Sequence, residues 1–121
     1  GRGNNFAYVA PDADTEKVIP VIVNAKTDKI SGCNALDKIL IDKKHPHFKE
    51  IARKIESELT MHDIHVIASD DLLEILDTQT KISDESVWRE EFLAKKAAMG
   101  TVDGLEHAID FINTYSGGHS N

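Results

Sequence analysis

One stretch organises this sequence: residues 24–41, which read NAKTDKISGCNALDKILI. It holds the single cysteine of the chain, Cys33, directly after a glycine that lets the backbone turn sharply and leaves the thiol uncrowded. Lys26 and Lys29 precede the cysteine, and nearby positive charge lowers the pKa of a thiol toward the reactive thiolate. A helical turn starting near Asn34 would add the positive end of a helix dipole. These residues indicate a candidate nucleophile, although a single free cysteine is more often a small buried hydrophobe.

The same stretch resembles the nucleophile segment of the gamma-glutamyl phosphate reductase family, in the aldehyde dehydrogenase superfamily. The resemblance rests on Asn24-Ala25-Lys26-Thr27, then on Gly32-Cys33-Asn34-Ala35-Leu36, and on the apolar Ile39-Leu40-Ile41 that follows. The family usually has a proline and a glycine shortly before the cysteine, where this chain has Ile30-Ser31-Gly32. We therefore expect the chain to approach the cysteine along a different path.

A second match begins at Glu91. The triplet Glu91-Phe92-Leu93 looks like the superfamily segment whose glutamate holds the hydroxyls of the nicotinamide ribose, and a carboxylate can accept two hydrogen bonds from such a diol. Ser116-Gly117-Gly118-His119-Ser120 is similar to a Gly-Ser-Gly-His turn of the family, and its two glycines suit close approach of the backbone to a substrate. From the residues alone, Glu91 would be one more solvated acid and the last residues a flexible tail.

The fold that the resemblance implies is α/β, with an open, mostly parallel sheet and flanking helices, as in the thiol-bearing catalytic domain of the superfamily. Residues 1–121 would be that domain, taken from a longer chain whose dinucleotide-binding domain lies elsewhere. The implied reaction is the NADPH-dependent reduction of L-glutamyl 5-phosphate to L-glutamate 5-semialdehyde in proline biosynthesis. The whole protein would be a homo-oligomer, and an association with glutamate 5-kinase, or a fusion to it, is a further implication.

The resemblance also implies which side chains carry the chemistry. The Cys33 thiolate would attack the acyl phosphate and form a thioester, which accepts a hydride well. Asn34, Lys26 and His119 are the candidates for contacts to the substrate or to the oxyanion. Glu91 is the candidate ligand of NADPH, and most of the site for that cofactor would lie outside this chain. We therefore expect the chain by itself to be inactive.

The composition predicts one globular domain, with 121 residues, 40% hydrophobic and 29% charged. A net charge of -7 argues against a general affinity for nucleic acid or for acidic membranes. No apolar run approaches the roughly 20 residues that a membrane-spanning helix needs. A single cysteine cannot form an internal disulfide, which favours a reducing, cytoplasmic location.

Several elements follow from hydrophobic periodicity. Strands are predicted at Phe6–Ala10, Ile39–Ile41 and His65–Ala68. A helix is predicted from Pro46, with an apolar stripe and a solvent-exposed face that includes Glu56. The apolar stripe consists of Phe48, Ile51, Ala52, Ile55 and Leu59. Ser69 is expected to cap a short helix, and residues 103–106 fit a capping box that starts the last one. The buried face of that last helix is expected to contain Leu105, Ala108, Ile109 and Ile112.

Two segments give conflicting signals. Val18–Val23 is rich in β-branched residues and reads locally as a buried strand, whereas the resemblance implies a helix, which we adopt. Glu91–Ala98 has helical propensity, whereas the resemblance places a strand from about Ala97 to Val102.

Other classes of protein remain as alternatives. The chain could belong to another oxidoreductase of the superfamily, or be a non-catalytic interaction domain with an inert, buried cysteine. A metal site is not expected, because the pairs His45/His47 and His62/His65 have no third ligand at zinc-binding spacing and are more typical of surface histidines. Ser31 or Ser86 as a hydrolase nucleophile is weaker still, because no G-x-S-x-G motif is present.

Overall fold

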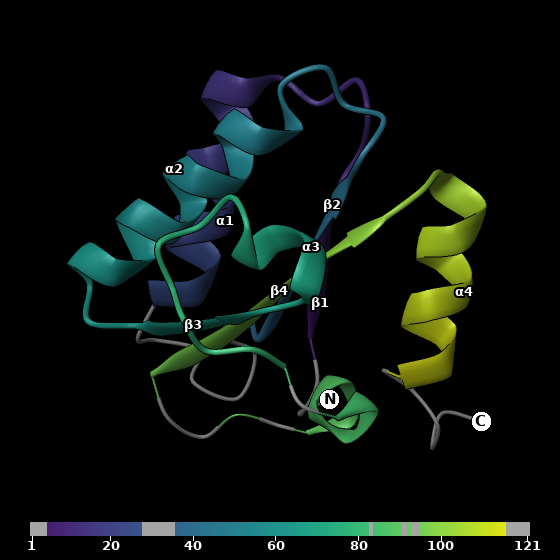
Figure 1. The fold of residues 1–121 in the computed structure, drawn as a ribbon. Helices are drawn as coiled ribbons and strands as arrows, with labels where there is room; N and C mark the ends of the chain where they lie inside the picture. The colour runs from purple at the N-terminus through teal and green to yellow at the C-terminus, as the bar shows by residue number, and fades with distance from the viewer. Residues whose placement is uncertain (1–4, 28–35, 83, 91, 93–94, 116–121) are drawn as a thin grey trace.

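The computed structural model describes residues 5–27, 36–82, 84–90, 92 and 95–115 (Figure 1). The strands are β1 (Phe6–Val9), β2 (Lys38–Asp42), β3 (His65–Ala68) and β4 (Lys96–Val102). The helices are α1 (Thr15–Thr27), α2 (Phe48–Met61), α3 (Asp70–Leu73) and α4 (Leu105–Tyr115), with a 3-10 helix η2 (Glu85–Arg89). The strands form one parallel sheet in the order β1-β2-β4-β3, which confirms the predicted α/β class. No helix in the described ranges is long and apolar enough to cross a bilayer.

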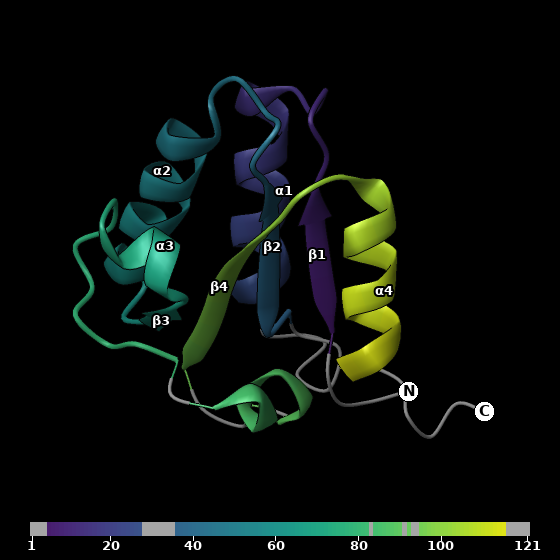
Figure 2. The same cartoon turned by 45° about the vertical axis from the view of Figure 1, so that its right-hand side comes forward.

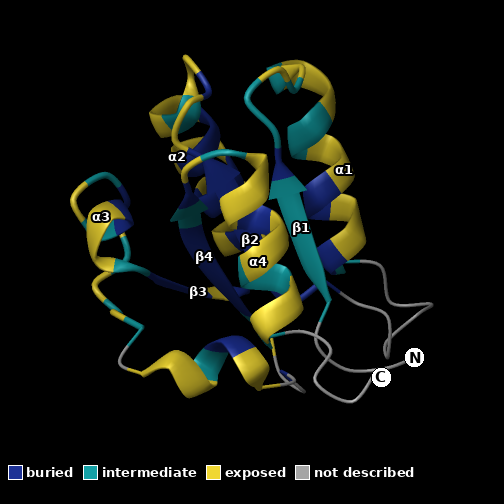
Figure 3. Ribbon diagram, turned by 90° about the vertical axis from the view of Figure 1, so that its right-hand side faces the viewer, coloured by how far each residue is buried: buried dark blue, intermediate teal, exposed yellow. Residues whose placement is uncertain are grey.

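Helices cover both faces of the sheet. Helices α1 and α2 lie on one face, and α4 lies on the other (Figure 2). Because successive side chains of a strand point to opposite faces, Ile39 and Ile41 pack with α1 and α2 while Leu40 packs toward α4. Strands β2 and β4 occupy the centre of the sheet and are the most deeply buried strands, and the dark blue of β4 in Figure 3 shows this.

Helix α1 resolves the first conflicting segment. Val18–Val23 is helical, so the prediction from the resemblance is confirmed and the strand expected from local propensity is wrong. The Asp14 carboxylate caps the helix by accepting the Glu16 N–H at 2.9 Å. Ile22 and Val23 are buried, and burial of this apolar face stabilises a helix that its β-branched residues would not form alone.

Strand β4 resolves the second conflicting segment. Lys96–Val102 is extended, which confirms the strand and contradicts the helical propensity of Lys96–Ala98. The strand lies between β2 and β3, so its backbone groups find partners on both sides. Pairing on two edges outweighs the weak helix preference of alanine and lysine.

Helix α2 differs in two details from the prediction. It begins at Phe48, and Pro46 lies in the preceding turn instead of the first helical turn. Glu56 was expected on the solvent-exposed face, yet it is only 6% exposed. Its carboxylate accepts the N–H groups of Asp77 and Thr78 at 3.0 and 2.7 Å, so it anchors the loop that follows α3.

His45 was expected at the surface, but it is only 5% exposed. Its Nε2 lies 2.8 Å from the Ala13 carbonyl oxygen, and its Nδ1 accepts the His47 N–H at 2.9 Å. The ring therefore joins the turn after β2 to the turn before α1. This structural role needs no metal.

The starts of α3 and α4 also depart from the capping predictions. The Ser69 hydroxyl donates to the Asp71 carboxylate at 2.6 Å and makes no capping bond to the backbone. The Asp103 N–H, which a capping box would direct to Glu106, donates instead to His107 Nδ1 at 3.0 Å. On α4, Leu105 and Ile109 are 59% and 47% exposed, so their predicted burial is wrong, while Ala108 is fully packed.

Candidate functional site

Most of the predicted site residues lie outside the described part of the chain. This applies to Cys33, Asn34, Glu91 and His119. The structure does place Lys26, the two segments that end at Thr27 and begin again at Leu36, and the direct neighbours of Glu91, which are Glu90 and Phe92. These flanking residues meet at the edge where the strands begin, which we call the amino edge of the sheet.

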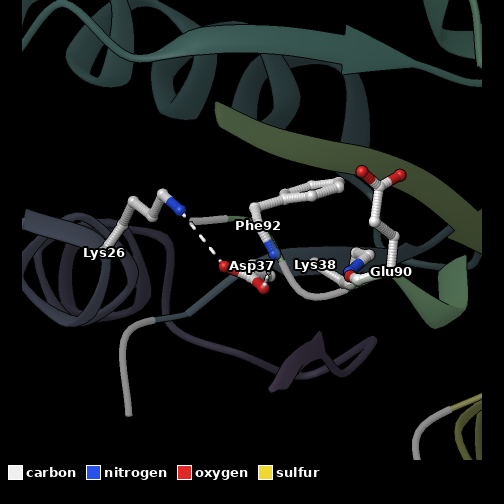
Figure 4. A network of polar contacts seen from close by, with 5 residues as sticks. All are labelled: Lys26, Asp37, Lys38, Glu90 and Phe92. Carbon is white, nitrogen blue, oxygen red and sulfur yellow. Dashed lines mark hydrogen bonds and ion pairs between the residues drawn. The ribbon is translucent and has the colours of Figure 1, made fainter. Parts of the chain in front are cut away.

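The two ends of the stretch that carries Cys33 are held together. Helix α1 ends at Thr27, and residue 36 begins the approach to β2. The Lys26 Nζ forms an ion pair with Asp37 Oδ1 at 3.4 Å, and both side chains are almost completely buried (Figure 4). The Leu36 N–H donates to the Ala25 carbonyl oxygen at 3.4 Å. The helix end and the strand start are thus fixed relative to each other.

Both neighbours of Glu91 bind the same dipeptide, Asp37-Lys38. The Phe92 N–H donates to Asp37 Oδ2 at 2.8 Å, and the Lys38 Nζ donates to the Glu90 carbonyl oxygen at 2.5 Å. Figure 4 shows the side chains of Asp37 and Lys38 meeting the backbone of Phe92 and Glu90 in the segment after η2. Asp37 therefore contacts the end of α1 and the segment before β4 at the same time.

The sheet fixes this dipeptide in turn. The Asp37 and Lys38 N–H groups both donate to the Asn5 carbonyl oxygen, at 3.1 and 3.0 Å. The Asp37 carbonyl oxygen accepts the Ala98 N–H of β4 at 3.0 Å. Because its main chain is bound on both sides, the dipeptide can position the groups that its side chains bind, which are Lys26, Glu90 and Phe92.

The charges at this edge are costly to bury. Lys38 is fully buried, and burial lowers its pKa to about 8, although the negative charges of Asp37 and Glu90 oppose the shift. Burial also lowers the pKa of Lys26, against the attraction of Asp37. The Lys38 Nζ lies 4.1 Å from the centre of the Phe92 ring, an arrangement that favours a cation.

The sequence prediction of the site missed Asp37 and Lys38. Their signal was present, because two charged residues interrupt an apolar run at the start of β2, a strand that is buried along its whole length. Lys26 was proposed as a contact to the substrate or the oxyanion; the structure places its ammonium group beside Asp37, and the proposed contact stays a prediction.

A separate cavity of about 390 Å³ opens at the opposite edge, where β3 and β4 end. Its walls combine the aromatic rings of Trp88 and Phe111 with Asp70 and Asp71. The Asp71 carboxylate is already engaged by the hydroxyls of Ser69 and Thr101. In the part of the chain that the structure describes, no group of three His, Cys, Asp or Glu side chains could hold a metal ion.

Comparisons with known proteins match the whole chain to part of a longer enzyme. The gamma-glutamyl phosphate reductase of Thermotoga petrophila is 36% identical over 120 residues, which are 99% of this chain and 28% of that protein. The gamma-glutamyl phosphate reductase of Halalkalibacterium halodurans is 35% identical over the same shares. No protein-family model matches.

A solved structure agrees with these relatives. The crystal structure of gamma-glutamyl phosphate reductase from Thermotoga maritima matches with a TM-score of 0.86 at 35% identity, covering 98% of this chain and 28% of that one. This chain therefore spans little more than a quarter of the length of the proteins that it matches.

Proposed function

From the premise that this chain is homologous over its whole length to one part of the gamma-glutamyl phosphate reductases, we propose that it acts within a longer protein to reduce L-glutamyl 5-phosphate to L-glutamate 5-semialdehyde with NADPH, in proline biosynthesis. The observation that carries this proposal is the match in sequence and fold to such a reductase. The geometry adds support, because one buried dipeptide holds both segments to which the chemistry is assigned.

The chain would supply the catalytic domain of that protein. Its relatives are more than three times as long, which leaves room for a dinucleotide-binding domain outside the 28% that is matched. A homo-oligomer, and an association with glutamate 5-kinase, are part of the same proposal. Size-exclusion chromatography of the full-length protein, with and without the kinase, would test both.

The residues at the amino edge suit a nicotinamide cofactor. A carboxylate at position 91 could accept hydrogen bonds from both hydroxyls of a ribose. Its neighbours Glu90 and Phe92 are fixed through their backbones, so such a carboxylate would be presented from a supported segment. NADPH, when bound, supplies the hydride that reduces the acyl group.

The acyl chemistry is assigned to Cys33. Its thiolate sulfur attacks the carbonyl carbon, the bond from that carbon to the phosphate oxygen breaks, and a thioester remains on the protein. The Cys33 N–H and Asn34 are the candidate donors to the oxyanion. After reduction, the carbon–sulfur bond breaks, the aldehyde leaves and the thiolate is restored. His119 and Lys26 are the further candidates for contacts to the substrate.

The test is Cys33→Ser in the full-length protein. We expect reductase turnover to fall by several orders of magnitude, because the hydroxyl is a poor substitute for a covalent thiolate nucleophile. The far-UV spectrum and the unfolding midpoint should stay close to wild type, since the two side chains differ little in size. Activity above a tenth of wild type would reject the covalent mechanism.

Glu91→Gln separates the assignment of the cofactor from that of the nucleophile. We expect weaker NADPH binding or slower hydride transfer, while acylation of Cys33, followed as single-turnover phosphate release, is retained. Normal steady-state kinetics with NADPH would mean that Glu91 is a solvated surface acid.

A further inference from the structure

We propose that Lys38 is a positioning residue: its ammonium group, enclosed beneath the Phe92 ring, holds Glu90 and Phe92 against the start of β2 and so supports nucleotide binding. This inference rests on the proposed function, because it assigns a support to the segment in which Glu91 is the candidate ribose ligand.

The contacts of Lys38 carry the argument. Its Nζ donates to the Glu90 carbonyl oxygen at 2.5 Å and lies 4.1 Å from the centre of the Phe92 ring. The centre of the Phe6 ring of β1 lies 5.9 Å from the same nitrogen. The side chain is 0% exposed, so the ammonium group is enclosed by the strand edge and by the segment that it holds.

The cost of this arrangement indicates that it does more than stabilise the fold. Removing an ammonium group from water is energetically costly, and a well-packed apolar side chain is often equally or more stabilising at such a position. A methionine could fill much of the space that Lys38 occupies. What methionine could not do is donate to the Glu90 carbonyl or place a cation against Phe92.

The charges around the Lys38 ammonium group make its contacts with Glu90 and Phe92 dependent on pH. Asp37 and Glu90 favour the charged form, whereas Lys26 of α1 and Lys96 of β4 disfavour it, as does burial. Because these influences bring the pKa of Lys38 to about 8, the group loses its charge on moving from neutral to mildly alkaline conditions. Nucleotide affinity should therefore fall as the pH rises through about 8.

The functional experiment measures the Kd of NADPH for the full-length protein. At pH 7, Lys38→Met should raise the Kd at least tenfold. Lys96→Met is the matched control, because the Lys96 Nζ also lies over the Phe92 ring, at 4.6 Å, on a partly exposed side chain. It should change the Kd less than twofold. Lys38→Arg, which keeps its charge, should bind nearly as well as wild type and lose the decline in affinity above pH 8.

A structural experiment on the same protein is independent of the nucleotide. Hydrogen exchange at the Phe92 amide reports the bond from that N–H to Asp37, and Lys38→Met should reduce its protection factor at least tenfold. The Lys43 amide, which donates to the Val102 carbonyl at the other end of β2, should be unaffected.

The outcomes separate this inference from the proposed function. If wild type does not bind NADPH, the proposed function fails, and the exchange experiment still decides whether Lys38 fixes the segment. If a folded Lys38→Met variant keeps wild-type protection at Phe92 or wild-type affinity for NADPH, the inference is overturned. If Lys38→Met does not fold, the pH profile of Lys38→Arg decides: an unchanged decline above pH 8 would show that Lys38 does not control binding.

Discussion

A buried aspartate stands at each end of β2, and the two have different partners. Asp42, at the end of the strand, accepts the Tyr8 hydroxyl at 2.6 Å and the N–H groups of Lys44 and Gly104 at 2.9 and 3.1 Å. All of these donors are uncharged. Asp37, just before the strand, accepts one backbone N–H and pairs with an ammonium group, and a second ammonium group, that of Lys38, lies nearby.

The difference shows how one strand can serve two purposes. Burial by itself would raise the pKa of Asp42, but the hydrogen bonds that it accepts, aided by the positive charge of Lys44, outweigh burial and hold that pKa below its usual range. Burial and the bond to Asp42 raise the pKa of Tyr8 to about 12. This end of β2 thus joins β1 to the start of α4 through a satisfied network. The amino edge gathers costly charges around the segments to which we assign the chemistry.

The largest expected effect is that of Asp42→Ala, which should lower the free energy of unfolding by about 4 kcal/mol. Three donors would lose their acceptor, and two of these are backbone N–H groups at the start of a turn and of a helix. Urea denaturation measures the loss. Protection of the Phe92 amide should be retained in the folded fraction; if it is lost as well, the two ends of β2 are not independent.

Asp37→Asn should lower the free energy of unfolding by about 2 kcal/mol. The amide oxygen can replace only one carboxylate oxygen, and neither an ammonium group nor a backbone N–H can accept a bond from the new amide NH2, so either Lys26 or the Phe92 N–H loses its acceptor. The matched control is Asp42→Asn, where the Tyr8 hydroxyl can reverse and accept instead. We expect that change to cost less than about 1 kcal/mol. Equal costs at the two positions would contradict the distinction between the two ends.

Much of the fold was predictable because its signals are local. The apolar runs of β2 and β3 and the apolar stripe of α2 determine their elements from neighbouring residues alone. Local propensity gave the wrong structure for Val18–Val23 and for Lys96–Ala98. The first segment is a helix packed on the sheet, and the second is a strand within it, so tertiary contacts decide both. In both cases the family resemblance supplied the tertiary information that the composition of the segment lacks.

From sequence alone, site residues can be proposed only where a side chain carries its own chemical signal, and the roles proposed for Cys33 and Glu91 stay predictions. A single cysteine beside lysines, or an acid before an aromatic residue, can be found by eye. Asp37 and Lys38 act through partners 11 and 52 residues away in the sequence, which no local pattern reveals. The same holds for Glu56 and His45, whose burial depends on loops that fold back onto them.

Tyr8→Phe sharpens the comparison by removing one donor from Asp42 without changing its charge. We expect a loss of about 1.5 kcal/mol at neutral pH, the range for a hydrogen bond to a charged group. In wild type, stability should also fall as the pH rises from 10 toward 12, because the folded state keeps a phenol proton that the unfolded chain releases. The phenylalanine variant should lack that alkaline loss, measured as unfolding midpoints across this range. If the phenylalanine variant loses stability at alkaline pH as wild type does, the loss does not arise from the Tyr8 phenol.

The smallest expected effect has the opposite sign and belongs to Lys38. Its pKa falls from 10.5 in the free side chain to about 8 in the fold, so between these values the unfolded chain holds a proton that the folded chain has released. Wild-type stability should therefore rise with pH there, by at most about 1 kcal/mol between pH 8 and 9. Lys38→Met should abolish the rise, and at pH 7 it should be no less stable than wild type, since it removes a buried charge. Lys96→Met should keep the rise. A methionine variant that is markedly less stable at pH 7 would mean that the buried ammonium group serves the fold itself, and the contrast between the two ends of β2 would then disappear.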